Sequence, residues 1–254
     1  MRPTLQQVAR IWAHWPLPRA AAVAVLGYHR VEDDGGPLAV STRAFRLHLR
    51  VLDAERQRRP VLDLDDAIDR LAAGTAPRRA VVVTFDDGWA DNHSNALGPL
   101  VEHRVPATLF VPSRLLGAPG RLSRAQLLEM AAAGVSVGAH SRTHADLTAC
   151  GDAELEREVR GSREDLEDLL GAPCTCFAYP LGRLDGRVRA AVAAAGFRTA
   201  VTTVRGWARA STDPLRIARN FIEDFDAATF SAALRGGLNY LRPVEAARER
   251  LGRR

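Results

Sequence analysis

Apolar runs alternate with amphipathic stretches along most of the chain, and this alternation constrains the fold more than any other feature. The predicted strands cover residues 21–28, 80–85, 107–112, 135–140, 175–180, 197–203 and 215–222. The predicted helices cover residues 41–54, 92–103, 123–134, 152–170, 185–196 and 226–235, and residues 61–74 form a short strand and then a helix. Repeated strand–helix units produce mostly parallel strands with crossover helices. Seven or eight units in one domain predict an α/β fold, a distorted (β/α)7-type barrel with outer helices, rather than an open doubly wound sheet.

The 254 residues show no linker and no low-complexity tract. We therefore expect an extension over residues 1–20, one folded domain over 21–240 and a basic tail over 241–254. No apolar run approaches the roughly 20 residues of a membrane span, and residues 20–26 are too short an apolar run for a signal peptide. These features predict a cytoplasmic protein without an integral span. They do not specify an oligomeric state.

The net charge is +5 and all 35 basic residues are arginine. The arginines are scattered and only 6% of residues are aromatic, which argues against nucleic-acid binding. A solvated basic surface is one interpretation, and weak association with an anionic polymer or membrane surface is the other. The phosphate-binding patterns GxGxxG and GxxxxGK[ST] do not occur, which counts against nucleotide chemistry. The three cysteines contain no CxxC pair and are expected to be reduced thiols.

Two adjacent acids, Asp86 and Asp87, follow the predicted strand 80–85. They form either a solvated turn or part of a cation site, because neighbouring carboxylates repel each other. His140 ends another predicted strand and His144 follows four residues later. The carboxyl ends of parallel strands meet on one rim, and two imidazoles with a carboxylate are a common metal-binding set. The second acid is then free to act as a base.

The segments TFDDG (84–88) and HSRTH (140–144) resemble the first two motifs of the polysaccharide deacetylases, also called the NodB-homology or carbohydrate esterase 4 family. The resemblance extends over about residues 22–225. It also includes the segments LGYHRV (26–31), PATLFVP (106–112), LGAPCTCFAYPLG (170–182) and AAAGFRTAVTT (193–203).

The resemblance implies that Asp87, His140 and His144 hold one divalent metal ion, with Zn²⁺ expected and Co²⁺ or Ni²⁺ as alternatives. It implies that Asp86 is the general base for a metal-activated water. The third motif, AYPLG (178–182), is expected to line the substrate groove.

Within that motif the resemblance assigns substrate binding to Tyr179, Pro180 and Gly182, with the Tyr179 backbone as an oxyanion donor. Trp207 and Trp89 are candidates for stacking on sugar rings, and packing is the alternative for both.

The chain departs from the family pattern at three places. Ala178 stands where the family commonly has an arginine that orients the base, and Arg219 is the candidate replacement, with a buried structural ion pair as its alternative role. Leu181 replaces the usual tyrosine. No histidine follows His144, so His29 is the candidate general acid, with a core or supporting role as its alternative.

The remaining histidines, which include His48, are expected at the surface of helices. The predicted function is metal-dependent removal of N-acetyl groups from an N-acetylated amino sugar or glycan. An O-acetyl esterase acting on acetylated polysaccharide and a catalytically silent carbohydrate-binding protein are the alternatives.

Overall fold

The computed structural model describes residues 20–36 and 38–238. The predicted extension, apart from Ala20, and the predicted basic tail lie outside the described residues. The described part contains a seven-stranded parallel sheet with the order β8-β7-β6-β5-β4-β1-β9. Its strands are β1 (Ala22–Tyr28), β4 (Arg79–Phe85), β5 (Ala107–Val111), β6 (Ser136–Ala139), β7 (Cys176–Ala178), β8 (Thr199–Val201) and β9 (Asn220–Phe221). A small second sheet pairs β2 (Arg30–Val31) with β3 (Ala39–Val40).

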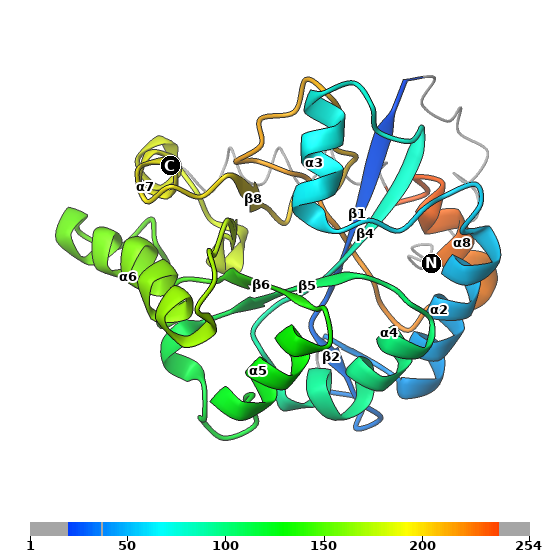
Figure 1. The fold of residues 1–254 in the computed structure, drawn as a ribbon, viewed down its shortest axis with the longest axis horizontal. Coiled ribbons are helices and arrows are strands. Elements are labelled where there is room, and N and C mark those ends of the chain that lie inside the picture. Colours follow the sequence, from blue (N-terminus) through cyan, green and yellow to red (C-terminus); the bar gives the residue numbers. More distant parts are fainter. Residues whose placement is uncertain (1–19, 37, 239–254) are drawn as a thin grey trace, which may run out of the picture.

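The helices follow the strands in alternation, as the sequence predicts. They are α2 (Thr42–Glu55), α3 (Leu64–Ala72), α4 (Gly98–Glu102), α5 (Arg124–Ala132), α6 (Asp152–Leu170), α7 (Gly186–Ala194) and α8 (Ala227–Leu234). The predicted helix over 92–103 begins as a π-helix, η2 (Asn92–Leu97), before continuing as α4. Helices α2, α4, α5 and α6 succeed one another around the outside of the curled sheet (Figure 1).

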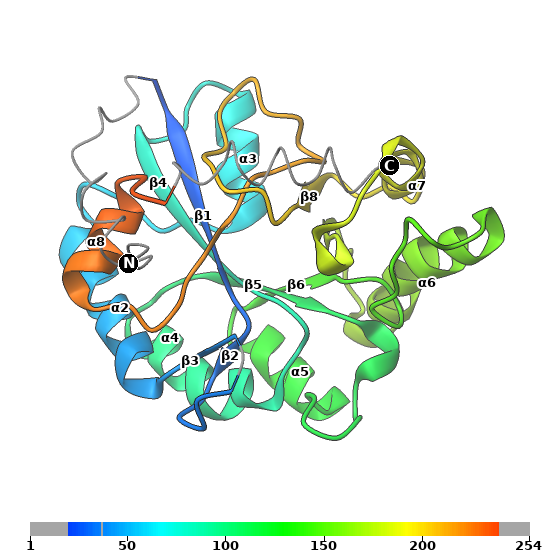
Figure 2. The same ribbon diagram turned by 180° about the vertical axis from the view of Figure 1, so that it is seen from behind.

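The last segment of the sheet joins its two edges. The sequence predicts a strand over 215–222, but the regular strand β9 is only two residues long because the segment divides its pairing between two partners. Ile217 pairs with Val201 of β8, and three residues later Asn220 pairs with Leu26 of β1. The segment therefore connects β8 to β1, and the sheet curls into the predicted distorted barrel (Figure 2).

Side chains on β4 alternate between two apolar layers, as a strand buried on both faces requires. Val81 and Val83 belong to the large cluster that packs beneath the outer helices. Ala80 and Val82 belong to the barrel interior, where Leu64 and other residues of α3 pack against them. Asp86 follows directly at the end of this strand.

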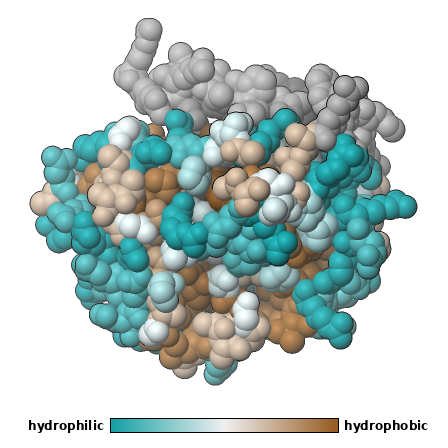
Figure 3. Space-filling view, turned by 45° about the horizontal axis from the view of Figure 1, so that its top comes forward, coloured by the Kyte–Doolittle hydropathy of each residue, from teal (hydrophilic) through white to brown (hydrophobic). Residues whose placement is uncertain are grey.

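One face of the molecule mixes hydrophilic and hydrophobic residues (Figure 3), and the cysteines of the described residues are unpaired. Figure 3 shows one face on which hydrophilic side chains dominate and apolar atoms appear between them. Within the described residues no helix combines the length and hydropathy that a membrane span needs.

Cys150, Cys174 and Cys176 are free and buried, which agrees with the prediction of reduced thiols.

Candidate functional site

The site begins with a strained turn at the end of β4. Asp86 donates its backbone N–H to the Tyr28 carbonyl at 2.9 Å, which continues the pairing of β4 with β1. Asp87 and Gly88 then both adopt positive φ, of 73° and 61°. The guanidinium of Arg121 donates to the Asp87 carbonyl at 2.7 Å. The turn therefore projects the two carboxylates in different directions from adjacent residues.

The two histidines come from the end of β6 and the loop after it. The His140 backbone N–H donates to the Val111 carbonyl of β5 at 3.1 Å. Its Nδ1 lies 2.7 Å from the Ala178 carbonyl, and a carbonyl only accepts, so Nδ1 carries the proton and Nε2 of the neutral ring has a free lone pair. His144 adopts a φ of 62°, and its N–H donates to the Ser141 hydroxyl at 3.0 Å.

Asp87, His140 and His144 converge and fit a divalent transition-metal ion. One ligand atom from each lies within 4.8 Å of the others, the one such group of three among the described residues. The Asp87 Oδ1 atom is 3.5 Å from His140 Nε2 and 3.3 Å from His144 Nε2. Imidazole nitrogen with carboxylate oxygen is a donor set suited to Zn²⁺, Co²⁺ or Ni²⁺.

The electrostatics favour the protonation states that metal ligands need. Burial raises the pKa of Asp87, but the interactions of its carboxylate with His140, His29 and His144 outweigh this and hold the pKa well below its usual range. Burial lowers the pKa of His144, and His140 lowers it further. Asp87 is therefore ionised and His144 neutral near neutral pH.

Asp86 and Arg219 form a buried bidentate ion pair. The guanidinium donates to Oδ1 at 2.6 Å and to Oδ2 at 2.7 Å, with the side chains 4% and 0% exposed. Arg219 also donates to the Thr202 carbonyl at 3.0 Å and lies over the Phe221 ring at 4.9 Å. Burial raises the pKa of Asp86, and the charge and hydrogen bonds of Arg219 bring it below its ordinary value.

His29 reaches the same carboxylate from the end of β1. Its Nε2 atom lies 4.0 Å from Asp86 Oδ2, and its ring stacks on Phe221 at 5.2 Å between centroids. Burial lowers the pKa of His29, and the charge of Asp86 opposes that shift. The pairing of β1 with β4 thus supplies the proximity on which the prediction for His29 depends.

Backbone strain is concentrated around this site. Six non-glycine residues in the described part of the chain have positive φ, and four of them are Asp87, Ser141, His144 and Leu181. Such conformations cost free energy and persist where the surroundings impose them, commonly at functional sites.

Three assignments in the AYPLG segment and at Trp207 need correction. The Tyr179 side chain is buried and donates its hydroxyl to the Leu215 carbonyl at 2.9 Å, and its backbone N–H donates to the Val201 carbonyl at 3.3 Å. Tyr179 is therefore not a free oxyanion donor or substrate contact. Trp207 is buried against Ala22 and Ala24, toward the amino-terminal end of β1, which favours its packing alternative over the sugar contact.

Pro180 and Gly182 shape the turn rather than present side chains to a substrate. Both are buried, and Gly182 has a φ of 67° with no room for a Cβ, which would lie 2.0 Å from the Thr203 hydroxyl. Leu181 between them is 55% exposed. In the hydrogen bonds of the described residues, the Leu181 N–H has no acceptor.

Sequence reasoning missed several residues that hold the site in place. Trp89 donates its indole N–H to Asp87 Oδ2 at 3.2 Å, whereas the sequence suggested only sugar stacking or packing. Glu158 of α6 accepts the backbone N–H groups of Arg142 and Thr143, each at 2.9 Å. No local sequence signal marks Glu158 or Arg121, because their partners lie in distant loops.

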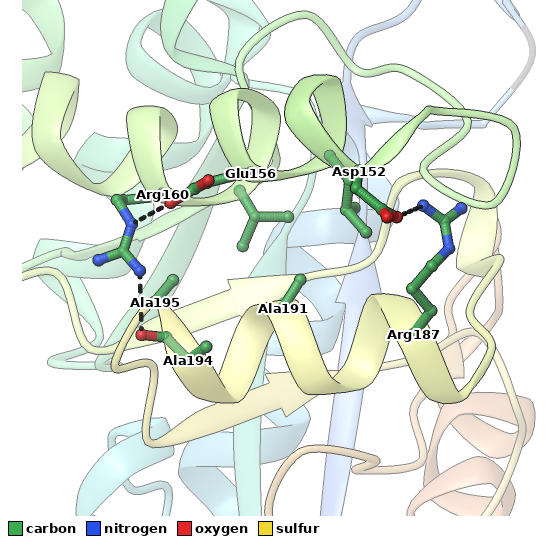
Figure 4. Close-up of a pocket in the computed structure, with 9 residues that line it drawn as sticks. Asp152, Glu156, Arg160, Arg187, Ala191, Ala194 and Ala195 are labelled. Carbon is green, nitrogen blue, oxygen red and sulfur yellow. Dashed lines mark hydrogen bonds and ion pairs between the residues drawn. The ribbon is translucent and has the colours of Figure 1, made fainter.

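Two hollows in the described structure lie away from the candidate site. One, of about 200 Å³, separates α6 from α7 and is bordered by the Arg187–Asp152 ion pair and by Arg160, which contacts Glu156 and the Ala194 carbonyl (Figure 4). The other, of about 540 Å³, lies at the amino-terminal ends of β5 and β6, opposite the site. No residue of the site lines either hollow.

Comparison with known proteins places these residues in a family context. Residues 73–200 match the family described as "Polysaccharide deacetylase". The chain is 27% identical over 189 residues to "Putative polysaccharide deacetylase YxkH" of Bacillus subtilis, a match that covers 74% of this chain and 67% of that one. It is 45% identical over 82 residues to "Chitooligosaccharide deacetylase" of Sinorhizobium fredii, covering 32% of this chain and 36% of that one.

A solved structure shares the fold. The Streptococcus pyogenes deacetylase PplD, determined in complex with acetate, superposes with a TM-score of 0.77 at 24% identity, covering 83% of this chain and 96% of that one.

Proposed function

Because the chain belongs to the polysaccharide deacetylase family, we propose that it is a metal-dependent hydrolase that removes N-acetyl groups from an amino sugar or glycan. One observation carries the proposal: a buried carboxylate held by an arginine, Asp86, lies directly beside the convergent set Asp87, His140 and His144. This combination offers a metal site and, from the residue next to one of its ligands, a separate base.

Asp87, His140 and His144 would hold the metal ion, with Zn²⁺ expected. A bound divalent ion would supply Lewis acidity, which acidifies water and polarises an acetyl carbonyl. The hydrogen bond from His140 Nδ1 to the Ala178 carbonyl orients the ring so that Nε2 faces Asp87. Such outer partners commonly set the orientation of ligating histidines.

Asp86 would act as the general base that takes the proton of the attacking water. Its bidentate pairing with Arg219 keeps it ionised in a buried position and fixes the plane of the carboxylate. Arg219 thus takes the role of the arginine that the family commonly has at the position of Ala178, and it acts on the reaction through Asp86. The buried ion pair is therefore also the interaction that orients Asp86.

His29 would donate a proton to the departing amine. Burial lowers the pKa of the His29 ring, so His29 would first take up the proton that Asp86 removes from water, and its Nε2 lies 4.0 Å from Asp86 Oδ2. Leu181 would supply the backbone N–H for the oxyanion in place of Tyr179, because its amide has no acceptor and its turn lies at the end of β7. A preorganised N–H of this kind stabilises charge that develops in the transition state.

Acetate release tests the proposal. The protein, loaded with Zn²⁺ or stripped with a chelator, is incubated with N-acetylated and O-acetylated mono- and oligosaccharides, beside Asp86→Asn. Metal-dependent release from the N-acetylated compounds, lost in Asp86→Asn, is the expected result. Release from O-acetylated compounds alone would make the protein an esterase, and release that persists in Asp86→Asn would refute the assignment of the base.

A further inference from the structure

We propose that Trp89 and Arg121 are positioning residues that restrict Asp87 to binding metal through a single oxygen, Oδ1. This inference rests on the metal site of the proposed function, and it concerns two residues that lie outside the motifs TFDDG, HSRTH and AYPLG. Neither side chain would touch the metal or the substrate. Both would act by fixing the carboxylate of Asp87.

The two oxygens of Asp87 face different neighbours. Oδ1 faces the imidazoles of His140 and His144, at 3.5 and 3.3 Å. Oδ2 accepts the indole N–H of Trp89 at 3.2 Å and lies 3.9 Å from the guanidinium of Arg121. Binding a metal through both oxygens would pull Oδ2 away from the indole and leave a half-buried N–H without a partner, which is unfavourable.

The indole is held in place without any help from a metal. The guanidinium of Arg121 lies over the Trp89 ring at 3.7 Å from its centroid, and that of Arg30 lies over it at 5.1 Å. Trp89 and Arg121 also form an antiparallel backbone bridge. Arg30 is anchored in turn by Asp91 at 3.3 Å. The ring is therefore already covered by cations, which argues against the sugar-stacking role considered for Trp89.

Arg121 affects metal binding by Asp87 in two opposing ways. It donates to the Asp87 carbonyl at 2.7 Å, which supports the strained backbone of the metal ligand. Its positive charge close to Oδ2 opposes the binding of a cation on simple Coulomb grounds. A positioning role and an electrostatic role thus predict opposite effects when the charge is removed.

One-oxygen ligation has a consequence for metal choice. Three single-atom ligands suit a small ion with few ligands, as in zinc sites that keep a position for water. Ca²⁺ favours six to eight oxygen ligands, often including both oxygens of a carboxylate. Trp89 therefore favours transition metals over Ca²⁺ at this site.

Metal affinity measured by competition with a chromogenic chelator tests the inference. Trp89→Phe keeps an aromatic ring but removes the N–H, and Trp207→Phe is the matched control, since Trp207 packs against Ala22 and Ala24 of β1 and makes no contact with Asp87 in the described structure. We expect Trp89→Phe to bind Zn²⁺ about 10–100-fold more weakly, the usual effect of losing an outer partner, with Trp207→Phe unchanged. We expect the visible spectrum of the Co²⁺-loaded protein to change only in Trp89→Phe.

Arg121→Met separates positioning from charge. Weaker binding than in the wild type is expected, and tighter binding would overturn the role of Arg121. His140→Ala is run in parallel to test the metal site itself. If His140→Ala loses metal while Trp89→Phe keeps wild-type affinity and spectrum, the positioning inference is wrong and the proposed function stands. If His140→Ala retains full affinity, the metal site and both proposals are overturned.

Discussion

The buried pair of Asp86 and Arg219 allows a stability prediction whose size follows from its geometry. Replacing Arg219 by Met preserves most of the volume and leaves Asp86 as a carboxylate that is 4% exposed with no cation beside it. Removing one partner of a buried ion pair typically costs about 3–5 kcal/mol. Against a total stability of about 5–15 kcal/mol for a domain, this is a large fraction.

The cost should depend on pH with a definite sign. Without Arg219 the pKa of Asp86 in the folded protein rises above its unfolded value, because burial, the largest influence on it, is then opposed only by the smaller effects of His140 and His29. The destabilisation is therefore fully developed at neutral pH and is relieved as the pH falls through the raised pKa. In the wild type the pKa is lowered, so the pair stabilises the fold above the unfolded pKa and that contribution is lost in acid.

Urea unfolding of metal-free protein measures the effect, with a double variant as control. We expect Arg219→Met to lower the free energy of unfolding by about 3–5 kcal/mol at pH 7. Arg219→Met combined with Asp86→Asn should recover most of the loss, because no charge then remains buried. A cost below about 1 kcal/mol, or a double variant no more stable than Arg219→Met alone, would refute the reasoning.

Three further predictions follow from buried groups. Burial lowers the pKa of His48 to about 4 from 6.5. At about 1.36 kcal/mol per pKa unit, the free energy of unfolding should therefore fall by about 3 kcal/mol between pH 7 and pH 4. Urea titrations should show this pH dependence in the wild type and a flatter profile in His48→Gln. Gly138→Ala places a Cβ 2.6 Å from the Phe110 ring and 2.7 Å from the sulfur of Cys176. Calorimetry should therefore record a loss of about 1–3 kcal/mol in the free energy of unfolding from overpacking, and an unchanged melting temperature would contradict this prediction. Glu158→Ala leaves the N–H groups of the loop before His144 without their acceptor, so hydrogen exchange should accelerate there while β4 stays protected.

The alternation of elements could be predicted because each unit carries its own periodicity. The strands that end just before Asp86 and His140 are largely apolar, and the positions of the metal-ligand candidates follow from the strand ends. The strand predicted over 215–222 is shorter in the structure, since its pairing is shared between two edges of the barrel. That division depends on closure of the whole sheet, which local sequence does not encode.

The errors have local physical causes. His48 was expected at the surface, but it lies on the buried stripe of α2 with Ala44 and Leu52, where its ring contacts the Tyr28 hydroxyl and the Phe225 carbonyl. The four-residue spacing of these positions can be read from the sequence, but histidine is polar, so the sequence did not indicate that it would lie on the buried face. Trp207 has no periodic signal, because its burial depends on how an irregular loop returns to β1.

The segment that closes the barrel also has a consequence for how the protein is made. His29 leaves the ribosome 190 residues before Arg219, by the difference of their positions, and Asp86 between them lacks its arginine partner until the later segment has been made. The ion pair with Asp86 and the pairing that links β8 to β1 both depend on the segment around Arg219, so neither can form before that segment has been synthesised.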